Sequence, residues 1–263
     1  MKNDGTKTWK RYVAIGDSTT EGLDDPDGAG GYRGWADRFA EHVARAQGRI
    51  EYANLAVRGR LAREIKDQQL AAALALEPDL ATCIAGMNDL IRPRFDHHAV
   101  IADLEEMHTA LIGKGATLLT FTLPSPGPGM PLARLLLPRV QRYNAAVRVS
   151  AKRTGALVLD LGATPVASDP RLWSDDKLHA NSLGHERIAR GLAYTLGLDG
   201  FDDGWAEPLP SIDRTPLSRA LLADLAWART HLAPWIVRHV RGQSSGDDVV
   251  AKRPTPILIE ADP

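Results

Sequence analysis

Five short apolar runs alternate with longer segments whose apolar residues have helical spacing, and this alternation constrains the fold more than any other feature of the sequence. The runs lie at residues 12–15, 50–55, 79–84, 117–121 and 157–160. The helical segments that follow them lie near 35–46, 61–76, 99–113, 139–153 and 183–196. Apolar strands that alternate with helices are typical of a parallel sheet covered on both faces. We therefore predict an α/β fold, a three-layer α/β/α sandwich.

The composition excludes several classes of protein. Lys+Arg 32 and Asp+Glu 33 give a net charge of −1, which does not attract nucleic acid or an anionic membrane. A single cysteine, Cys83, excludes a disulfide framework and a Cys-rich metal site. The first residues lack the apolar run of a secretory signal, and no run is long enough to span a bilayer. We expect a cytoplasmic protein.

The alternation stops near residue 200, which divides the chain into an expected domain at 1–200 and a C-terminal extension at 201–263. Pro216 marks the start of one amphipathic helix in the extension, and Pro234 its end or a kink. That helix either packs on the core or serves as an oligomer contact or a cover for the active site. From Gly242 onward the chain is polar and contains prolines, so we expect an extended or disordered tail.

Polar or glycine-bearing turns follow four of the predicted strands. They lie at residues 16–18, 58–59, 86–89 and 175–179. Ligands of doubly wound sheets bind beyond the carboxyl ends of the strands, and all four turns open on that edge. The sequence therefore predicts a site there.

The residue types in these turns match the parts of a serine hydrolase site. Ser18 is a candidate nucleophile and His179 a candidate base. Asp176, three residues before His179, is close enough to orient the imidazole. The backbone N–H groups of Ser18 and Gly59 and the side-chain amide of Asn88 are candidate donors to an oxyanion.

Four sequence blocks are similar to those of the SGNH hydrolases, also called GDSL esterases/lipases. The blocks are Gly16-Asp17-Ser18-Thr19-Thr20-Glu21-Gly22, Asn54-Leu55-Ala56-Val57-Arg58-Gly59, Gly86-Met87-Asn88-Asp89 and Asp176-Lys177-Leu178-His179. All four name-giving residues are matched, in family order, and the resemblance spans about residues 10–197. It implies a flavodoxin-like sheet of five parallel strands and ester hydrolysis through an acyl-enzyme, with no metal and no cofactor.

Several residues near these blocks have open roles. Asp17 and Asp89 are expected to support the nucleophile and asparagine loops rather than take part in the chemistry. His185 and Asp175 are the nearest rivals of His179 and Asp176. Tyr32, Trp35 and Pro124 either line a substrate pocket or only pack on the core. The proline-rich stretch that includes Pro124, residues 122–131, is either a rigid connection or a substrate wall and lid.

Two rival functions stay open at this point. A metal-dependent phosphoesterase would need several His and carboxylate ligands around two ions. A non-catalytic binding module would have the same fold without using these residues for catalysis. The expected partner is a small-molecule ester. Acetylated sugars, lysophospholipids and short acyl esters all suit the motifs, and the oligomeric state is undetermined.

Overall fold

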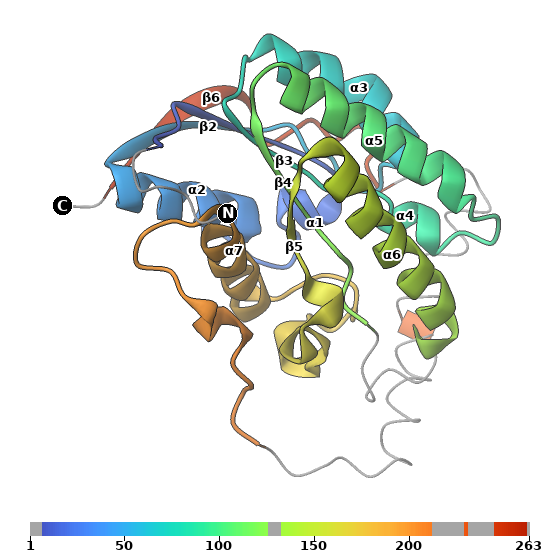
Figure 1. Ribbon diagram of the computed structural model, residues 1–263. Helices are drawn as coiled ribbons and strands as arrows, with labels where there is room; N and C mark the ends of the chain where they lie inside the picture. The colour runs from blue at the N-terminus through green and yellow to red at the C-terminus, as the bar shows by residue number, and fades with distance from the viewer. Residues whose placement is uncertain (1–6, 126–132, 212–228, 231–244, 262–263) are drawn as a thin grey trace.

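A computed structural model describes residues 7–125, 133–211, 229–230 and 245–261 of the chain (Figure 1). Its centre is a six-stranded sheet in the order β5-β4-β3-β1-β2-β6. The five parallel strands are β1 (Arg11–Ile15), β2 (Arg49–Asn54), β3 (Leu80–Cys83), β4 (Thr117–Phe121) and β5 (Leu157–Leu159). They coincide closely with the five predicted apolar runs.

Helices cover both faces of the sheet, as Figure 1 shows. One face carries α2 (Gly34–Gln47) and α7 (Ser182–Leu196), and the other carries α3 (Ala62–Ala75), α5 (His97–Gly113) and α6 (Leu137–Thr154). Two single-turn helices, α1 (Ser18–Glu21) and α4 (Met87–Leu90), follow β1 and β3. Short 3₁₀ helices occupy Ala133–Leu136, Leu161–Ala163, Pro165–Ser168, Pro170–Leu172 and Asp203–Ala206. The predicted three-layer α/β/α sandwich is confirmed.

The alternation of side chains along the central strand explains the two hydrophobic cores. Val13 and Ile15 of β1 are buried among residues of α3, α5 and α6, whereas Tyr12 and Ala14 are buried among residues of α2 and α7. Both layers therefore lock β1 in place, and the turn that follows its carboxyl end starts from a rigid support.

The sixth strand, β6 (Arg253–Glu260), is a difference from the sequence prediction. This part of the chain was expected to be an extended or disordered tail, but it pairs antiparallel with β2. Pro254 and Pro256 fit a strand at the sheet edge, where no further strand requires their missing N–H groups. The C-terminal residues thus extend the central sheet.

Two sequence predictions fall largely outside the described residues. The helix expected between Pro216 and Pro234 is described only at residues 229–230, and the proline-rich stretch only as far as Ser125. Within the described ranges, no helix combines the length and the apolar character that a membrane span needs.

Candidate active site

The carboxyl ends of the parallel strands bring the four predicted turns together. Ser18 is the first residue of α1, directly after β1, and Asn88 lies in α4, after β3. Gly59 lies in the turn after β2, and His179 lies in the loop between β5 and α7. Asn181 caps α7 and also donates to the carbonyl of Arg171, so it holds the loop two residues beyond His179.

Ser18, His179 and Asp176 form a continuous hydrogen-bonded chain. The Oγ of Ser18 lies 2.8 Å from Nε2 of His179, and Nδ1 of His179 lies 2.5 Å from Oδ2 of Asp176. The other carboxylate oxygen of Asp176 accepts the backbone N–H groups of Leu178 and His179 at 2.9 and 3.0 Å. These contacts fix the imidazole between hydroxyl and carboxylate, which is the geometry of a charge-stabilised general base.

The charges around the imidazole favour its protonated form. Burial alone lowers the pKa of His179, but the hydrogen bond and charge of Asp176, followed by the charges of Asp24 and Asp17, raise it above its usual value. Burial raises the pKa of Asp176, yet its hydrogen bond and charge interaction with His179 leave the net pKa well below the usual range. Asp176 therefore stays ionised beside an imidazole that can hold a proton.

A second carboxylate beside the triad was not identified from the sequence. Oδ2 of Asp24 lies 3.8 Å from Nδ1 of His179. The hydroxyl of Ser174 lies 2.6 Å from Asp24 and 2.7 Å from Asp176, so it bridges the two acids. Asp24 has a left-handed backbone, with φ of 65°, in a loop that no motif covers. Ser174 is two residues before Asp176, and that proximity was the one available signal.

The side-chain amide of Asn88 is directed at two oxygens near the nucleophile. Its Nδ2 donates to Oδ2 of Asp17 at 3.2 Å and to the carbonyl oxygen of Arg60 at 3.1 Å. The second contact places Asn88 beside the turn that carries Gly59, whose φ is 73°. The three predicted oxyanion donors therefore come from adjoining segments of one site.

Asp17 and Asp89 are placed as supports for the loops. Asp17 caps α1 through Thr19, and its carboxylate also accepts from Asn88. Asp89 accepts the backbone N–H of Ala62 at 3.0 Å and so ties α4 to the start of α3. Burial raises the pKa of both carboxyls.

An apolar cavity of about 70 Å³ adjoins the segments that carry Asn88 and His179. Its lining includes Met87, next to Asn88, and Leu178, next to His179. Pro124, whose role the sequence left open, also lines it, together with Leu136 and Trp173.

The other two predicted pocket residues lie elsewhere. Trp35 has no exposed surface and packs edge-on against Phe121 at 5.5 Å between ring centroids, so of the two roles left open for it, the structure shows packing on the core. Its place on the inner face of α2 explains the burial. Tyr32 is partly exposed, and its ring lies 5.3 Å from the guanidinium of Arg58.

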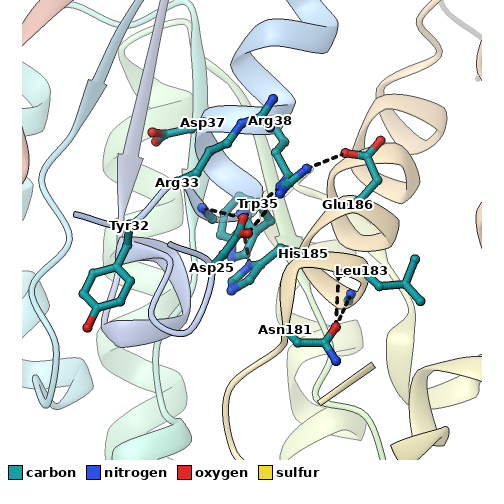
Figure 2. Close-up of polar contacts among 12 residues, drawn as sticks. Asp25, Tyr32, Arg33, Trp35, Asp37, Arg38, Asn181, Leu183, His185 and Glu186 are labelled. Atoms are coloured by element: carbon teal, nitrogen blue, oxygen red, sulfur yellow. Dashed lines mark hydrogen bonds and ion pairs between the residues drawn. The ribbon is translucent and has the colours of Figure 1, made fainter. Parts of the chain in front are cut away.

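His185 has a structural role, which Figure 2 makes visible. Its Nδ1 accepts the backbone N–H of Trp35 at 3.0 Å, and its Nε2 lies 3.0 Å from the carbonyl of Leu23. Burial lowers its pKa to about 4. Next to it, Arg38 joins Asp25 to Glu186. These contacts connect α7 to α2 and to the loop after α1. Both ring nitrogens of His185 have backbone partners, and its lowered pKa keeps it neutral.

In the described part of the chain, one group of side chains has its ligand atoms close enough to hold a metal ion. It consists of Asp24, Asp176 and His179, whose atoms lie within 4.8 Å of one another. The same atoms of Asp176 and His179 already form the hydrogen bond of the triad.

Comparison with known proteins places the chain among hydrolases. Residues 14–187 match the GDSL-like Lipase/Acylhydrolase family. The chain is similar to the solved structure of a lipase/acylhydrolase from Enterococcus faecalis, at 20% identity and a TM-score of 0.60 over 72% of this chain and 95% of that one. It is also similar to Axe2, an acetylxylan esterase from Geobacillus stearothermophilus, at 18% identity and a TM-score of 0.61 over 76% and 97% of the two chains.

A third similar structure is LAE5, an alpha/beta hydrolase from the metagenome of Lake Arreo, Spain. It is 18% identical, with a TM-score of 0.61 over 74% of this chain and 99% of that one. At these identities the three structures show a shared fold. A search of curated proteins gave no match.

Proposed function

Because this chain belongs to the GDSL-like lipase/acylhydrolase family, and is thereby a serine ester hydrolase of the SGNH type, we propose that Ser18, His179 and Asp176 form its catalytic triad. The observation that carries this assignment is the chain of contacts from Ser18 Oγ through the imidazole to Asp176, at 2.8 and 2.5 Å. A serine hydroxyl is a weak nucleophile until an adjacent base removes its proton, and His179 is in position to do so.

The proposed reaction proceeds in two halves. Ser18 Oγ attacks the ester carbonyl carbon while its proton moves to Nε2 of His179, and Asp176 stabilises the resulting imidazolium. The tetrahedral intermediate collapses, and its alcohol leaves with the proton from His179. His179 then takes a proton from water, whose oxygen attacks the acyl-enzyme. The acid departs and Ser18 regains its proton.

The negative oxygen of each intermediate is assigned to the N–H groups of Ser18 and Gly59 and to the amide of Asn88. Both N–H groups of that amide already have acceptors in Asp17 and Arg60. When the oxyanion forms, one of these N–H groups turns to it or is shared with it. An ionised oxyanion accepts a stronger hydrogen bond than a peptide carbonyl, so exchange of the Arg60 contact is favoured.

The apolar cavity supports a substrate with a short, apolar acyl chain. Its volume of about 70 Å³ is roughly half that of an engineered apolar cavity that binds benzene, which suits an acyl group of a few carbons. The lining residues Met87 and Leu178 adjoin two proposed site residues, so the cavity is within reach of an acyl group on Ser18. An acetylated sugar, the substrate class named for Axe2, is the alternative.

A chain-length series tests both the reaction and the substrate class. We expect p-nitrophenyl butyrate to be hydrolysed with a higher kcat/KM than the acetate or the laurate, and Ser18→Ala to remove turnover of all three. Release of acetate from acetylated xylo-oligosaccharides at a higher kcat/KM than from butyrate esters would favour the alternative. A preference for long-chain lysophospholipids would contradict the assignment of the cavity.

Two adjacent leucines provide a matched test of the cavity. Leu136 lines it, whereas Leu135 is 79% exposed. Leu136→Phe is expected to move the preference from butyrate to acetate, because the larger ring occupies the space of the chain. Leu135→Phe is expected to leave the preference unchanged. An equal effect of both variants would show that the cavity does not hold the acyl chain.

A further inference from the structure

The turn that carries Gly59 is held on one side by residues of the proposed active site. The carboxylate of Glu21, in the helix that begins at Ser18, accepts the backbone N–H of Arg58 at 2.8 Å and pairs with its guanidinium. The carbonyl of Arg60 accepts from Asn88 at 3.1 Å. The residues on either side of Gly59 are therefore bound to segments that carry the nucleophile and the asparagine.

The C-terminal segment packs against the same turn. Gly246 is buried, and a methyl group on its Cα would lie 2.0 Å from the carbonyl oxygen of Arg58 and 3.1 Å from Cγ1 of Val57. The guanidinium of Arg60 donates to the carbonyl of Gly246 at 3.3 Å. Such close backbone approach requires glycine, because any Cβ at this position would clash with a carbonyl oxygen.

The atom that Gly246 approaches belongs to the peptide whose N–H is the proposed oxyanion donor. The carbonyl oxygen of Arg58 and the N–H of Gly59 are parts of one planar trans peptide, so they point in opposite directions. A contact on the oxygen therefore fixes the direction of the N–H. Gly59 has a φ of 73°, and glycine adopts positive and negative φ with similar ease. The Arg58–Gly59 peptide can therefore rotate unless packing prevents it.

The segment that carries Gly246 is tied to the core by residues farther along the chain. Nζ of Lys252 donates to the carbonyls of Tyr32 and Arg33 at 3.0 and 2.7 Å and lies 2.9 Å from the buried carboxylate of Asp37. Arg253 pairs with the same carboxylate, and β6 then continues along β2 (Figure 1). These bonds hold Gly246 against the turn.

We propose that Gly246 is a positioning residue for the hydrolase reaction: by packing on the Arg58 carbonyl it holds the Gly59 N–H toward the oxyanion. This inference rests on the proposed oxyanion role of Gly59. It gives the C-terminal segment a part in catalysis although none of its residues is assigned a chemical step. The glycine before β6 then supports the oxyanion site through the peptide that the glycine after β2 contributes.

Gly246→Ala tests the proposal, with Gly113→Ala as the matched control. Neither glycine has a positive φ, and a methyl group at Gly113 meets no atom within 4 Å. We expect Gly246→Ala to lower kcat for a butyrate ester at least about 10-fold with KM within twofold, a part of the 10²–10³ that one oxyanion donor contributes. Gly113→Ala keeps the wild-type kcat. In ¹⁵N–¹H spectra, the Gly59 amide resonance moves in Gly246→Ala and not in the control.

The outcomes separate this inference from the proposed function. Wild-type kcat in folded Gly246→Ala protein, while Asn88→Ala and Ser18→Ala are impaired, overturns the inference and leaves the hydrolase mechanism intact. Full turnover in Ser18→Ala overturns the mechanism itself. Should Gly246→Ala fail to fold, Arg60→Met carries the test, since it removes the bond to Gly246 without adding an atom at the contact. Its kcat is expected to fall with KM nearly constant, and an unchanged kcat overturns the inference.

Discussion

The carboxylate of Asp17 accepts a hydrogen bond from the side-chain amide of Asn88 at 3.2 Å, so the residue before the nucleophile holds the proposed oxyanion asparagine. The other oxygen of the same carboxylate accepts the backbone N–H of Thr19 at 3.0 Å and caps α1. One side chain therefore contacts the segments that carry two groups, Ser18 and Asn88, which we propose to act on the same substrate carbonyl. This explains why the site holds a buried acid, Asp17, in addition to Asp176, the proposed partner of the base.

Asp17→Asn separates these two tasks. The asparagine keeps an oxygen to cap α1, but its amide nitrogen cannot accept from Asn88. We expect kcat to fall by roughly 10-fold, since small displacements of catalytic groups are costly, while the melting temperature stays near that of the wild type. Steady-state kinetics and thermal unfolding check both parts. Unchanged kcat would mean that Asn88 is held sufficiently by Arg60.

Asn88→Ala removes the proposed third oxyanion donor. By the magnitude of such losses in other hydrolases, kcat is expected to fall by about 10²–10³ with a smaller effect on KM. The measurement is kcat on a butyrate ester, with the exposed Gln68 replaced by alanine as a control. A variant with full kcat would show that Asn88 does not contact the oxyanion.

Asp24→Asn tests the second carboxylate through the pH dependence of activity. His179 acts as a base only when neutral, so kcat/KM rises as the pH passes upward through its pKa. Asp24 is one of the charges that raise that pKa, after Asp176, so its neutralisation lowers the pKa. The acidic limb of the profile is therefore expected to move to lower pH. Asp203→Asn, at an exposed position that is not among the charges acting on His179, leaves the profile unchanged. A shift toward higher pH would contradict the account.

Lys252→Met tests whether the C-terminal segment stabilises the fold. The ammonium group is mostly buried and binds two carbonyls and the Asp37 carboxylate, so its loss is expected to cost about 1–3 kcal/mol of unfolding free energy. The melting temperature should fall by several degrees. The exposed Lys152, changed to methionine, is the control. Equal melting temperatures for both variants would show that the segment adds little stability.

The sequence predicted the parts of the molecule that depend on local pattern and on motif. Each of the five parallel strands coincides with a predicted apolar run, and each motif residue lies in the connection between a strand and the next long helix. Because parallel strands end at one edge, the meeting of Ser18 and His179 across 161 positions could be expected from topology. The hydrogen bonds themselves required the structure.

The features that were missed depend on contacts between distant segments. The run Ile257-Leu258-Ile259 is too short to distinguish a strand from a tail with two prolines nearby, and its partner β2 lies some 200 positions away. Trp35 begins an amphipathic helix, and spacing alone does not say which face of its first turn is covered. Asp24 and Gly246 lie in loops, where the residue type alone does not predict which atoms the residue contacts.

The central claim is that Ser18 is activated by His179, and intact mass after exposure to a fluorophosphonate probe tests it most directly. Such a probe forms a covalent bond only with an activated serine, and the experiment needs no knowledge of the substrate. The account predicts one adduct on the wild-type chain, mapped to Ser18 and absent from Ser18→Ala, with much slower labelling of His179→Ala. Equal labelling of wild type and Ser18→Ala, or no adduct on folded wild-type protein, would contradict it.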